Sequence, residues 1–337
     1  MRQPSFFGFF SFMAVASILA GWVFFRGIQN SNRVGSTPLV KPLVVSTIAP
    51  LEALVCALAG DCVQSVSLIP GNLDPHSYQL RKGDGDLFLL ADLVVYNGLG
   101  LEHGSSLFNS LHQSPTSFSI GTCLLEQDEN FVIHANGVTD PHIWLDLSLM
   151  AKVVSPLAER LSKIFTEDDK KKLIFLRAKK IEERFLNADK MARALIDEVP
   201  IEKRYLISAH SAFRYFVRSY FGTSQERQNG LWEKRYASPE GLAPESQVSF
   251  STLKEVFEFM LNHQINVLFQ EVNVPSRALS RLVSMASQHG YKTRLATRPL
   301  YSDSFPDFSK MADPLDGYLE IVVDNARIFR DEIMEGT

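Results

Sequence analysis

The feature that most constrains the fold is a run of residues, 167–198, that contains neither glycine nor proline. Its apolar side chains recur at helical spacing, and Thr166 followed by Asp168 and Asp169 provides an N-cap and a negatively charged first turn. A helix of about 30 residues is about 45 Å long. A surface helix or a coiled-coil strand would also give this pattern, but no strict heptad is sustained. We therefore predict a rigid connector between two parts of the chain.

Strand and helix patterns alternate on both sides of this connector. The predicted strands are residues 43–48, 63–69, 93–97, 205–208 and 266–270. The predicted helices are residues 51–59, 86–91, 213–220, 251–262, 276–289 and 318–333, besides a helical stretch that begins at 147. Such alternation is typical of parallel sheets with crossover helices. The expected fold class is α/β, with two lobes that each contain a parallel sheet and flanking helices, joined by one long rigid helix, and a cleft between them.

The length of 337 residues, 45% of them hydrophobic, also favours two domains over one. The predicted division is a signal or anchor segment with a spacer at 1–34, an N-terminal α/β lobe at 35–165, a linker helix at 166–199 and a C-terminal α/β lobe at 200–337.

The N-terminus is typical of an export signal. Arg2 precedes an uncharged apolar run, residues 6–25, which ends at Arg26. The run is about 20 residues long, enough to span a bilayer. A cleaved signal and a retained membrane anchor both remain open. No cysteine lies near the end of the run to accept a lipid.

Charge and cysteine content exclude two kinds of site. The chain has 34 basic and 38 acidic side chains and a net charge of −4, so it lacks the basic surface expected of a protein that binds nucleic acid. Cys56, Cys62 and Cys123 are too few and too irregularly spaced for a thiolate metal site, and an odd number cannot pair completely. A bridge between Cys56 and Cys62 remains an option in an oxidising compartment.

One triplet occurs twice and indicates metal chemistry. Residues 74–76 and 140–142 both read Asp-Pro-His, and each is followed two positions later by an aromatic residue. The proline before each histidine restricts the backbone, and a nearby carboxylate could accept the second N–H of the imidazole and so hold the ring for coordination. His76 and His142 are therefore candidate metal ligands.

Two further candidates come from the second half of the chain. His210 follows a predicted strand and precedes a helix, where open α/β sheets usually bind ligands, and Asp303 lies in a late loop. Three imidazoles and one carboxylate suit zinc, manganese or iron. Glu271, at the end of strand 266–270, competes for the fourth position, with a supporting or hinge role as its alternative. The other histidines lack such placement and are interpreted as surface or structural residues: His103, His112, His134, His263 and His289.

Several segments, in this order, resemble the metal-site segments of the zinc, manganese and iron solute-binding proteins of bacterial ABC importers, the adhesin-like solute-binding family 9. The matching segments are residues 74–78, 140–146, 210–216, 269–271 and 300–304. The resemblance extends over residues 43–333. It implies that His76, His142, His210 and Asp303 are the ligands of the bound metal.

The resemblance also implies the function. The expected protein is a periplasmic monomer that captures one divalent transition-metal ion (Zn, Mn or Fe) as cargo and delivers it to an inner-membrane ABC permease with its ATPase. Many zinc-selective members carry a loop rich in histidine and acidic residues, whereas residues 111–139 hold only two histidines. Manganese and iron binders of the family often have glutamate where this chain has His210, so the metal stays open among the three.

Two other functions remain as alternatives. No nucleophile with a partnered base is evident, so no enzymatic activity is expected. A metallohydrolase would keep an open metal position for water, and this alternative would gain if Asp303 were not a ligand. A binder of an organic iron chelate would instead use aromatic and arginine contacts, and substitution of His76 would leave its binding nearly intact.

Overall fold

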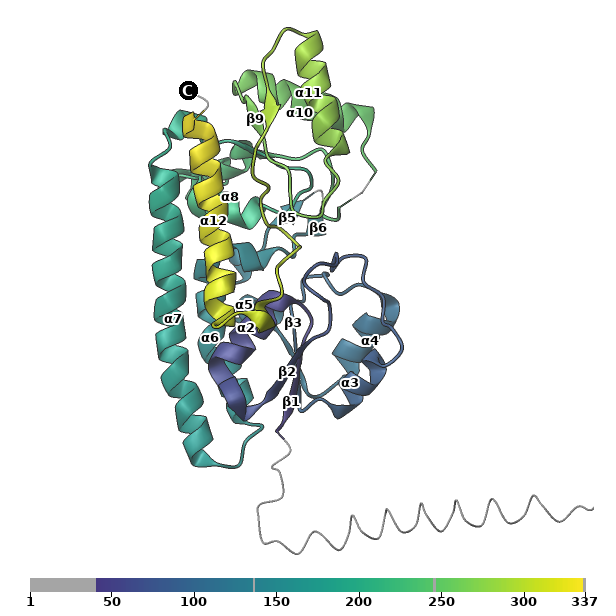
Figure 1. Cartoon of the computed structure of the whole chain (residues 1–337), viewed down its shortest axis with the longest axis vertical. Coiled ribbons are helices and arrows are strands. Elements are labelled where there is room, and N and C mark those ends of the chain that lie inside the picture. The colour runs from purple at the N-terminus through teal and green to yellow at the C-terminus, as the bar shows by residue number, and fades with distance from the viewer. Residues whose placement is uncertain (1–40, 136, 245–246, 336–337) are drawn as a thin grey trace, which may run out of the picture. The chain divides into compact units, whose positions relative to one another are not determined.

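The structure is a computed structural model that describes residues 41–135, 137–244 and 247–335 (Figure 1). The predicted signal or anchor segment, residues 1–34, lies outside the described residues. The chain divides into two units, residues 1–41 and 42–337, and the elements and the site lie in the second. Among the described residues, no helix is both long enough and apolar enough to span a membrane.

The N-terminal part contains a four-stranded parallel sheet in the order β2-β1-β3-β4. Its strands are β1 (Leu43–Ser46), β2 (Gln64–Ser67), β3 (Leu93–Tyr96) and β4 (Ser117–Ser119). The central strands β1 and β3 are apolar and almost wholly buried, as expected of parallel strands with both faces covered. The short hairpin of β5 (His134–Ala135) and β6 (Val138–Thr139) is antiparallel.

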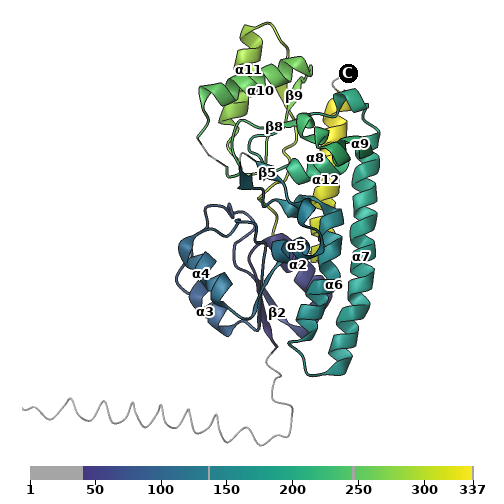
Figure 2. The same ribbon diagram turned by 180° about the vertical axis from the view of Figure 1, so that it is seen from behind.

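Helices cover both faces of this sheet. On one side lie α3 (Asp84–Leu90) and α4 (Ser105–Gln113), and on the other lie α2 (Ala49–Ala59) and α6 (Leu147–Ser162), as Figures 1 and 2 show. The remaining helix of this part, α5 (Ile120–Gln127), directly follows β4. The alternation of strand and crossover helix predicted from the sequence is confirmed.

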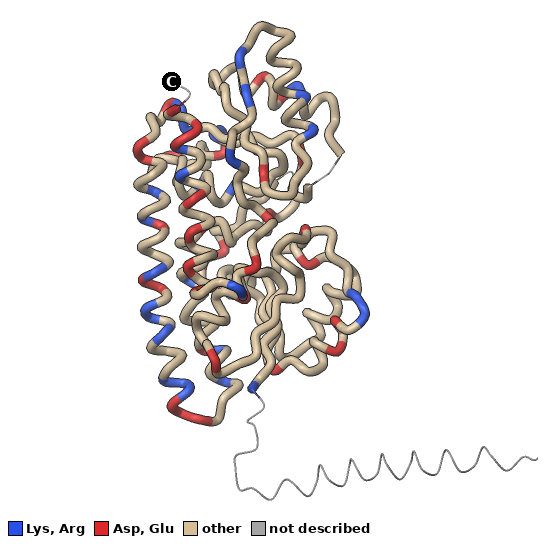
Figure 3. The backbone as a smooth tube through the Cα atoms, viewed as in Figure 1, with Lys and Arg blue, Asp and Glu red and all other residues tan. Residues whose placement is uncertain are grey.

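The long connector is a single helix, α7 (Asp168–Asp197), of 30 residues. It packs along α6 and along the last helix, α12 (Pro314–Glu335). The predicted N-cap at Thr166 is wrong by one position, because the backbone of Glu167 is extended and occupies the cap. Figure 3 shows both signs of charge interspersed along α7 and α12.

The C-terminal part is built from short parallel pairs. Its strands are β7 (Leu206–Ile207), β8 (Tyr236–Ala237), β9 (Val267–Leu268) and β10 (Arg294–Leu295). β7 pairs with β8 and β9 with β10, and a parallel bridge between Ser208 and Phe269 connects the two pairs. Its helices are α8 (Arg214–Tyr220), α9 (Ser224–Asn229), α10 (Phe250–Asn262) and α11 (Arg277–Gln288).

The apolar core has two parts. The larger part includes the N-terminal sheet, α6, α7, α8 and α12, with Trp144, Phe185 and Tyr318 fully buried. The smaller part lies between β7, β9, α10 and α11, around residues such as Met260 and Leu279. The last helix packs against α2 of the N-terminal part and against the connector α7, although it comes last in the order of elements. The three boundaries predicted between the four segments stay a prediction.

Candidate metal centre

The two Asp-Pro-His triplets form the same local turn. In the loop between β2 and α3, the backbone N–H of His76 donates to Asp74 Oδ1 at 2.8 Å. The backbone N–H of His142 donates to Asp140 Oδ1 at 2.9 Å, and His142 Nδ1 lies 2.7 Å from the same oxygen. Such turns use the aspartate side chain to accept from the chain two residues on. Asp74 thus holds the backbone of its histidine, whereas Asp140 holds both the backbone and the ring.

His210 follows the short strand β7 and is held by a carboxylate from a neighbouring strand end. Its backbone N–H donates to Glu271 Oε1 at 3.0 Å, and its Nδ1 lies 2.7 Å from Glu271 Oε2. Its carbonyl oxygen accepts hydrogen bonds from the hydroxyls of Ser208 and Tyr236, at 2.7 and 2.8 Å. Glu271 therefore contacts the far side of the imidazole ring and leaves Nε2 facing the other candidate ligands.

Asp303 completes the group. Its Oδ2 lies 3.0 Å from His210 Nε2 and 3.5 Å from His76 Nε2, and its Oδ1 lies 3.5 Å from His142 Nε2. The Nε2 atoms of His76 and His142 are 3.1 Å apart. One ligand atom from each of the four residues lies within 4.8 Å of all the others, and all four residues are buried. The structure thus brings together the four residues that the sequence analysis singled out.

The burial of the Asp303 carboxylate among the three imidazoles costs desolvation free energy, which a bound cation would offset. Neither carboxylate oxygen of Asp303 has a well-aligned hydrogen bond within the described part of the chain. Buried polar groups are normally hydrogen-bonded, because desolvation without a partner is costly. A cluster of ring nitrogens and carboxylate oxygens that converge on one point fits a bound metal ion, to which each would donate a lone pair.

The pKa values in the metal-free site indicate how a cation would compete with protons. Burial alone would lower the pKa of His210, but the carboxylates of Glu271 and Asp303 outweigh it and raise that pKa well above 6.5. Burial alone would raise the pKa of Asp303, but His210 and His142 hold it well below its ordinary value. The carboxylates thus favour the protonated form of His210, and an incoming cation must displace that proton.

Other side chains that the sequence analysis did not single out also support the site. Asn97, just after β3, donates from Nδ2 to the carbonyl oxygen of Pro141 at 2.9 Å. Tyr215 donates from its hydroxyl to the carbonyl oxygen of Asp140 at 3.1 Å. These contacts join segments that are far apart in sequence, so the sequence gives little sign of them. The one available signal is that Asn97 lies at the carboxyl end of a strand.

The remaining histidines lie outside the four-residue group. His263 stacks on Tyr205 with ring centroids 4.1 Å apart, and His112 stacks on Phe108 at 3.8 Å. These contacts fit the structural roles expected of them. The three cysteines are free, so the optional bridge between Cys56 and Cys62 is not formed.

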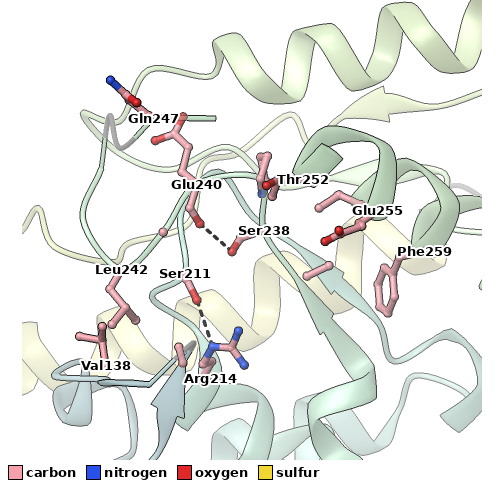
Figure 4. Close-up of a pocket in the computed structure, with 15 residues that line it drawn as sticks. Val138, Ser211, Arg214, Ser238, Glu240, Leu242, Gln247, Thr252, Glu255 and Phe259 are labelled. Atoms are coloured by element: carbon pink, nitrogen blue, oxygen red, sulfur yellow. Dashed lines mark hydrogen bonds between the residues drawn. The ribbon is translucent and has the colours of Figure 1, made fainter. Parts of the chain in front are cut away.

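A cavity of about 600 Å³ lies next to the third histidine (Figure 4). Ser211 and Arg214 line it, and Arg214 Nε donates to Ser211 Oγ at 3.0 Å. Glu240 and Glu255 also line it, so its charge is mixed. None of the four candidate ligands lines this cavity, so it is separate from the metal centre.

The fold has two α/β parts joined by one long helix, and the site is a buried group of histidines and a carboxylate. Together they define a class of protein, the solute-binding proteins of metal ABC importers. The chain belongs to the family of the periplasmic zinc-uptake complex component A, whose model matches residues 44–332. The family assignment and the fold class inferred from the sequence are confirmed.

Individual relatives bind different metals. The metal-binding protein YtgA of Chlamydia trachomatis is 35% identical over 295 residues, which cover 86% of this chain and 87% of that protein. The crystal structure of its Fe(III)-bound form matches with a TM-score of 0.80 at 33% identity, over 87% of this chain and 98% of that one. The zinc-binding protein TroA of Treponema pallidum is 27% identical over 268 residues, which cover 79% of this chain and 82% of the relative.

Proposed function

We propose that this protein binds one zinc, manganese or iron ion through His76, His142, His210 and Asp303, and delivers it as cargo to an ABC permease with its ATPase. The observation that carries the proposal is the convergence of four buried ligand atoms within 4.8 Å of one another. The segments that supply them are far apart in sequence, so their meeting needs the whole fold.

The donor set supports transition-metal cargo. Imidazole nitrogen and carboxylate oxygen are ligands of zinc, manganese and iron, whereas the thiolates that would select softer metals are absent from the group. Two of the rings have a carboxylate on their far nitrogen, which fixes the tautomer and makes the ring a stronger donor. These two carboxylates also add negative charge behind the imidazoles, and this favours a multiply charged cation.

A transport role accounts for the site better than catalysis. Catalytic zinc sites usually keep three protein ligands and one exchangeable water, whereas four protein ligands close a tetrahedral site. The metallohydrolase alternative requires Asp303 to be free of the metal, yet its oxygens lie 3.0 to 3.5 Å from all three imidazoles. The family consists of solute-binding proteins, and we propose that this chain performs no catalysis.

The proposal also covers location and organisation. Capture for import requires the binding site to face the outside of the inner membrane, and the charged and apolar pattern at residues 2–26 supports export by a signal or anchor. We propose the periplasm as its location, a monomer as its state, and the division into lobes at 35–165 and 200–337 with the linker helix at 166–199.

The test is metal binding by the purified full chain. The chain is stripped with a chelator, reloaded with zinc, manganese or ferrous iron in competition, and analysed for metal content beside a His142→Ala variant. One ion per chain in the wild type and a large loss of affinity in the variant are expected. Binding of less than stoichiometric metal, or binding that does not depend on His142, would contradict the proposal.

A further inference from the structure

The loop that carries Asp303 starts from the C-terminal sheet. The backbone N–H of Leu300 donates to the carbonyl oxygen of Gln270 at 2.8 Å, and the N–H of Val272 donates to the carbonyl oxygen of Leu300 at 2.9 Å. By these bonds Leu300 extends the strand end of the C-terminal part. From its position in the chain, Asp303 would be expected to belong to that part as well.

Beyond Leu300, however, the loop is bonded to the segment of the second histidine. Trp144 Nε1 donates to the carbonyl oxygen of Ser302 at 2.9 Å, and both residues are completely buried. Trp144 lies two residues after His142, and Ser302 directly precedes Asp303. The hydroxyl of Tyr318 on α12 donates to the carbonyl oxygen of Trp144 at 2.6 Å, and this bond holds the backbone of Trp144 in place.

The other end of the loop is bonded to the segment of the first histidine. The backbone N–H of Phe305 donates to the carbonyl oxygen of Gly71 at 2.6 Å, in the loop that leads to His76. The approach is close enough to require glycine, since a Cβ on Gly71 would lie 2.7 Å from the carbonyl oxygen of Phe305. Any larger residue must displace a backbone segment that begins two residues after Asp303.

A third contact holds the start of the loop on α12. The buried side chain of Asn325 accepts from the backbone N–H of Tyr301 at 2.9 Å and donates to its carbonyl oxygen at 2.8 Å. Since α12 packs against α2 and α7, this contact also connects the loop to the N-terminal part.

From these contacts we infer that Asp303 is held in place by the segments that carry His76 and His142. The positioning residues are Trp144, which bonds Ser302, and Gly71, which bonds Phe305. His210 is then the one ligand of the four held by the C-terminal sheet. The inference rests on the proposed function and adds to it a three-ligand half-site that stays assembled when His210 is removed.

The variant Gly71→Ala tests the steric part of the inference. It changes a partly buried loop and removes no side chain, so the fold is expected to survive. The matched control is Gly85→Ala, because a Cβ there meets nothing within 4 Å. Supporting residues of metal sites are worth about 10- to 100-fold in affinity, and we expect about tenfold weaker zinc binding in Gly71→Ala and no change in the control.

The variant Trp144→Phe tests the hydrogen-bonded part, with Trp232→Phe as the control for loss of a buried indole elsewhere. Cobalt(II) absorption of the loaded full chain reports the coordination sphere directly. We expect the Trp144→Phe spectrum to move toward that of Asp303→Ala. In a chain that already carries Asp303→Ala, the further substitution Trp144→Phe should reduce the affinity little. If Trp144 acts through Asp303, the effects of the two substitutions are not additive.

The variant His210→Ala tests the half-site. It should still bind one cobalt ion, more weakly than the wild type but more tightly than a chain in which Asp303 is also replaced by alanine.

The outcomes separate this inference from the proposed function. If the wild type binds no stoichiometric metal, the proposed function itself fails. If the wild type binds metal but Gly71→Ala and Trp144→Phe keep its affinity and spectrum, the positioning roles are refuted. Equal losses from Trp144→Phe with and without Asp303 would show a general structural effect, and complete loss of cobalt in His210→Ala would refute the half-site.

Discussion

The substitution Glu271→Gln is predicted to weaken metal binding and also to change how the affinity depends on pH. Glu271 contacts His210 through both oxygens, at 3.0 Å to the backbone nitrogen and 2.7 Å to Nδ1. Loss of a carboxylate behind a metal-bound imidazole typically costs about 10- to 100-fold in affinity. This corresponds to about 1.4 to 2.7 kcal/mol of binding free energy.

The pH dependence follows from the raised pKa of His210. Burial opposes the charged imidazole, but Glu271 and Asp303 raise its pKa well above 6.5, so the metal-free wild type holds a proton there at neutral pH. Metal binding must release this proton, and the affinity of the wild type should therefore keep rising with pH above 6.5. Without the charge of Glu271 the pKa of His210 is lower. In the variant, protons therefore stop competing with the metal for His210 at a lower pH than in the wild type.

The assay is a chelator-competition titration with zinc at a series of pH values. The ratio of zinc affinities between wild type and Glu271→Gln should be largest at high pH, where no proton competes with the metal for His210. This ratio should decrease as pH falls. Glu255→Gln, an exposed change on α10, is the matched control and should follow the wild type. A ratio that is constant over pH, or that increases toward low pH, would refute this reasoning.

Three further predictions concern the second histidine, the core and ligand-linked stability. Asp140→Asn should weaken metal binding about tenfold or more in competition titrations, and Asp74→Asn should weaken it less, because Asp74 holds only backbone. Phe185→Ala, fully buried on α7, should lower the free energy of unfolding by about 3 to 5 kcal/mol in urea titrations, whereas Leu176→Ala, 59% exposed, should change it by less than about 0.5 kcal/mol. Zinc at about 1,000 times its Kd should stabilise the wild type by about 4 kcal/mol in the same assay, and at that concentration His142→Ala should gain much less.

The long helix and the strands β1, β2 and β3 of the N-terminal sheet could be predicted from the sequence because their signals are local, whereas β4 was not predicted. The absence of glycine and proline over 167–198 corresponds to α7, which begins at Asp168 and ends at Asp197. The apolar runs at 43–48 and 93–97 contain the central strands β1 and β3. Strands of the C-terminal part were predicted at four or five residues, but β7 and β9 have two each, because isolated bridges and loops continue their pairing.

The candidate ligands could be singled out because a repeated triplet marks two of them and the other two lie in loops of the second half of the chain, His210 directly after a predicted strand. The contacts that hold these ligands in place could not be predicted. The bond from Trp144 to Ser302 joins residues 158 positions apart, and the close approach of Phe305 to Gly71 depends on where α12 returns along the chain. Contacts of this kind are determined by tertiary packing, for which neither periodicity nor motif spacing gives a signal.

The measurement that tests the central claim most directly is the X-ray absorption fine structure of the zinc-loaded full chain. The account predicts four nitrogen or oxygen ligands at about 2.0 to 2.1 Å, outer-shell scattering from three imidazole rings, and loss of one oxygen ligand in Asp303→Ala. Sulfur scattering at about 2.3 Å, or a spectrum with fewer than three imidazole rings in the wild type, would contradict it.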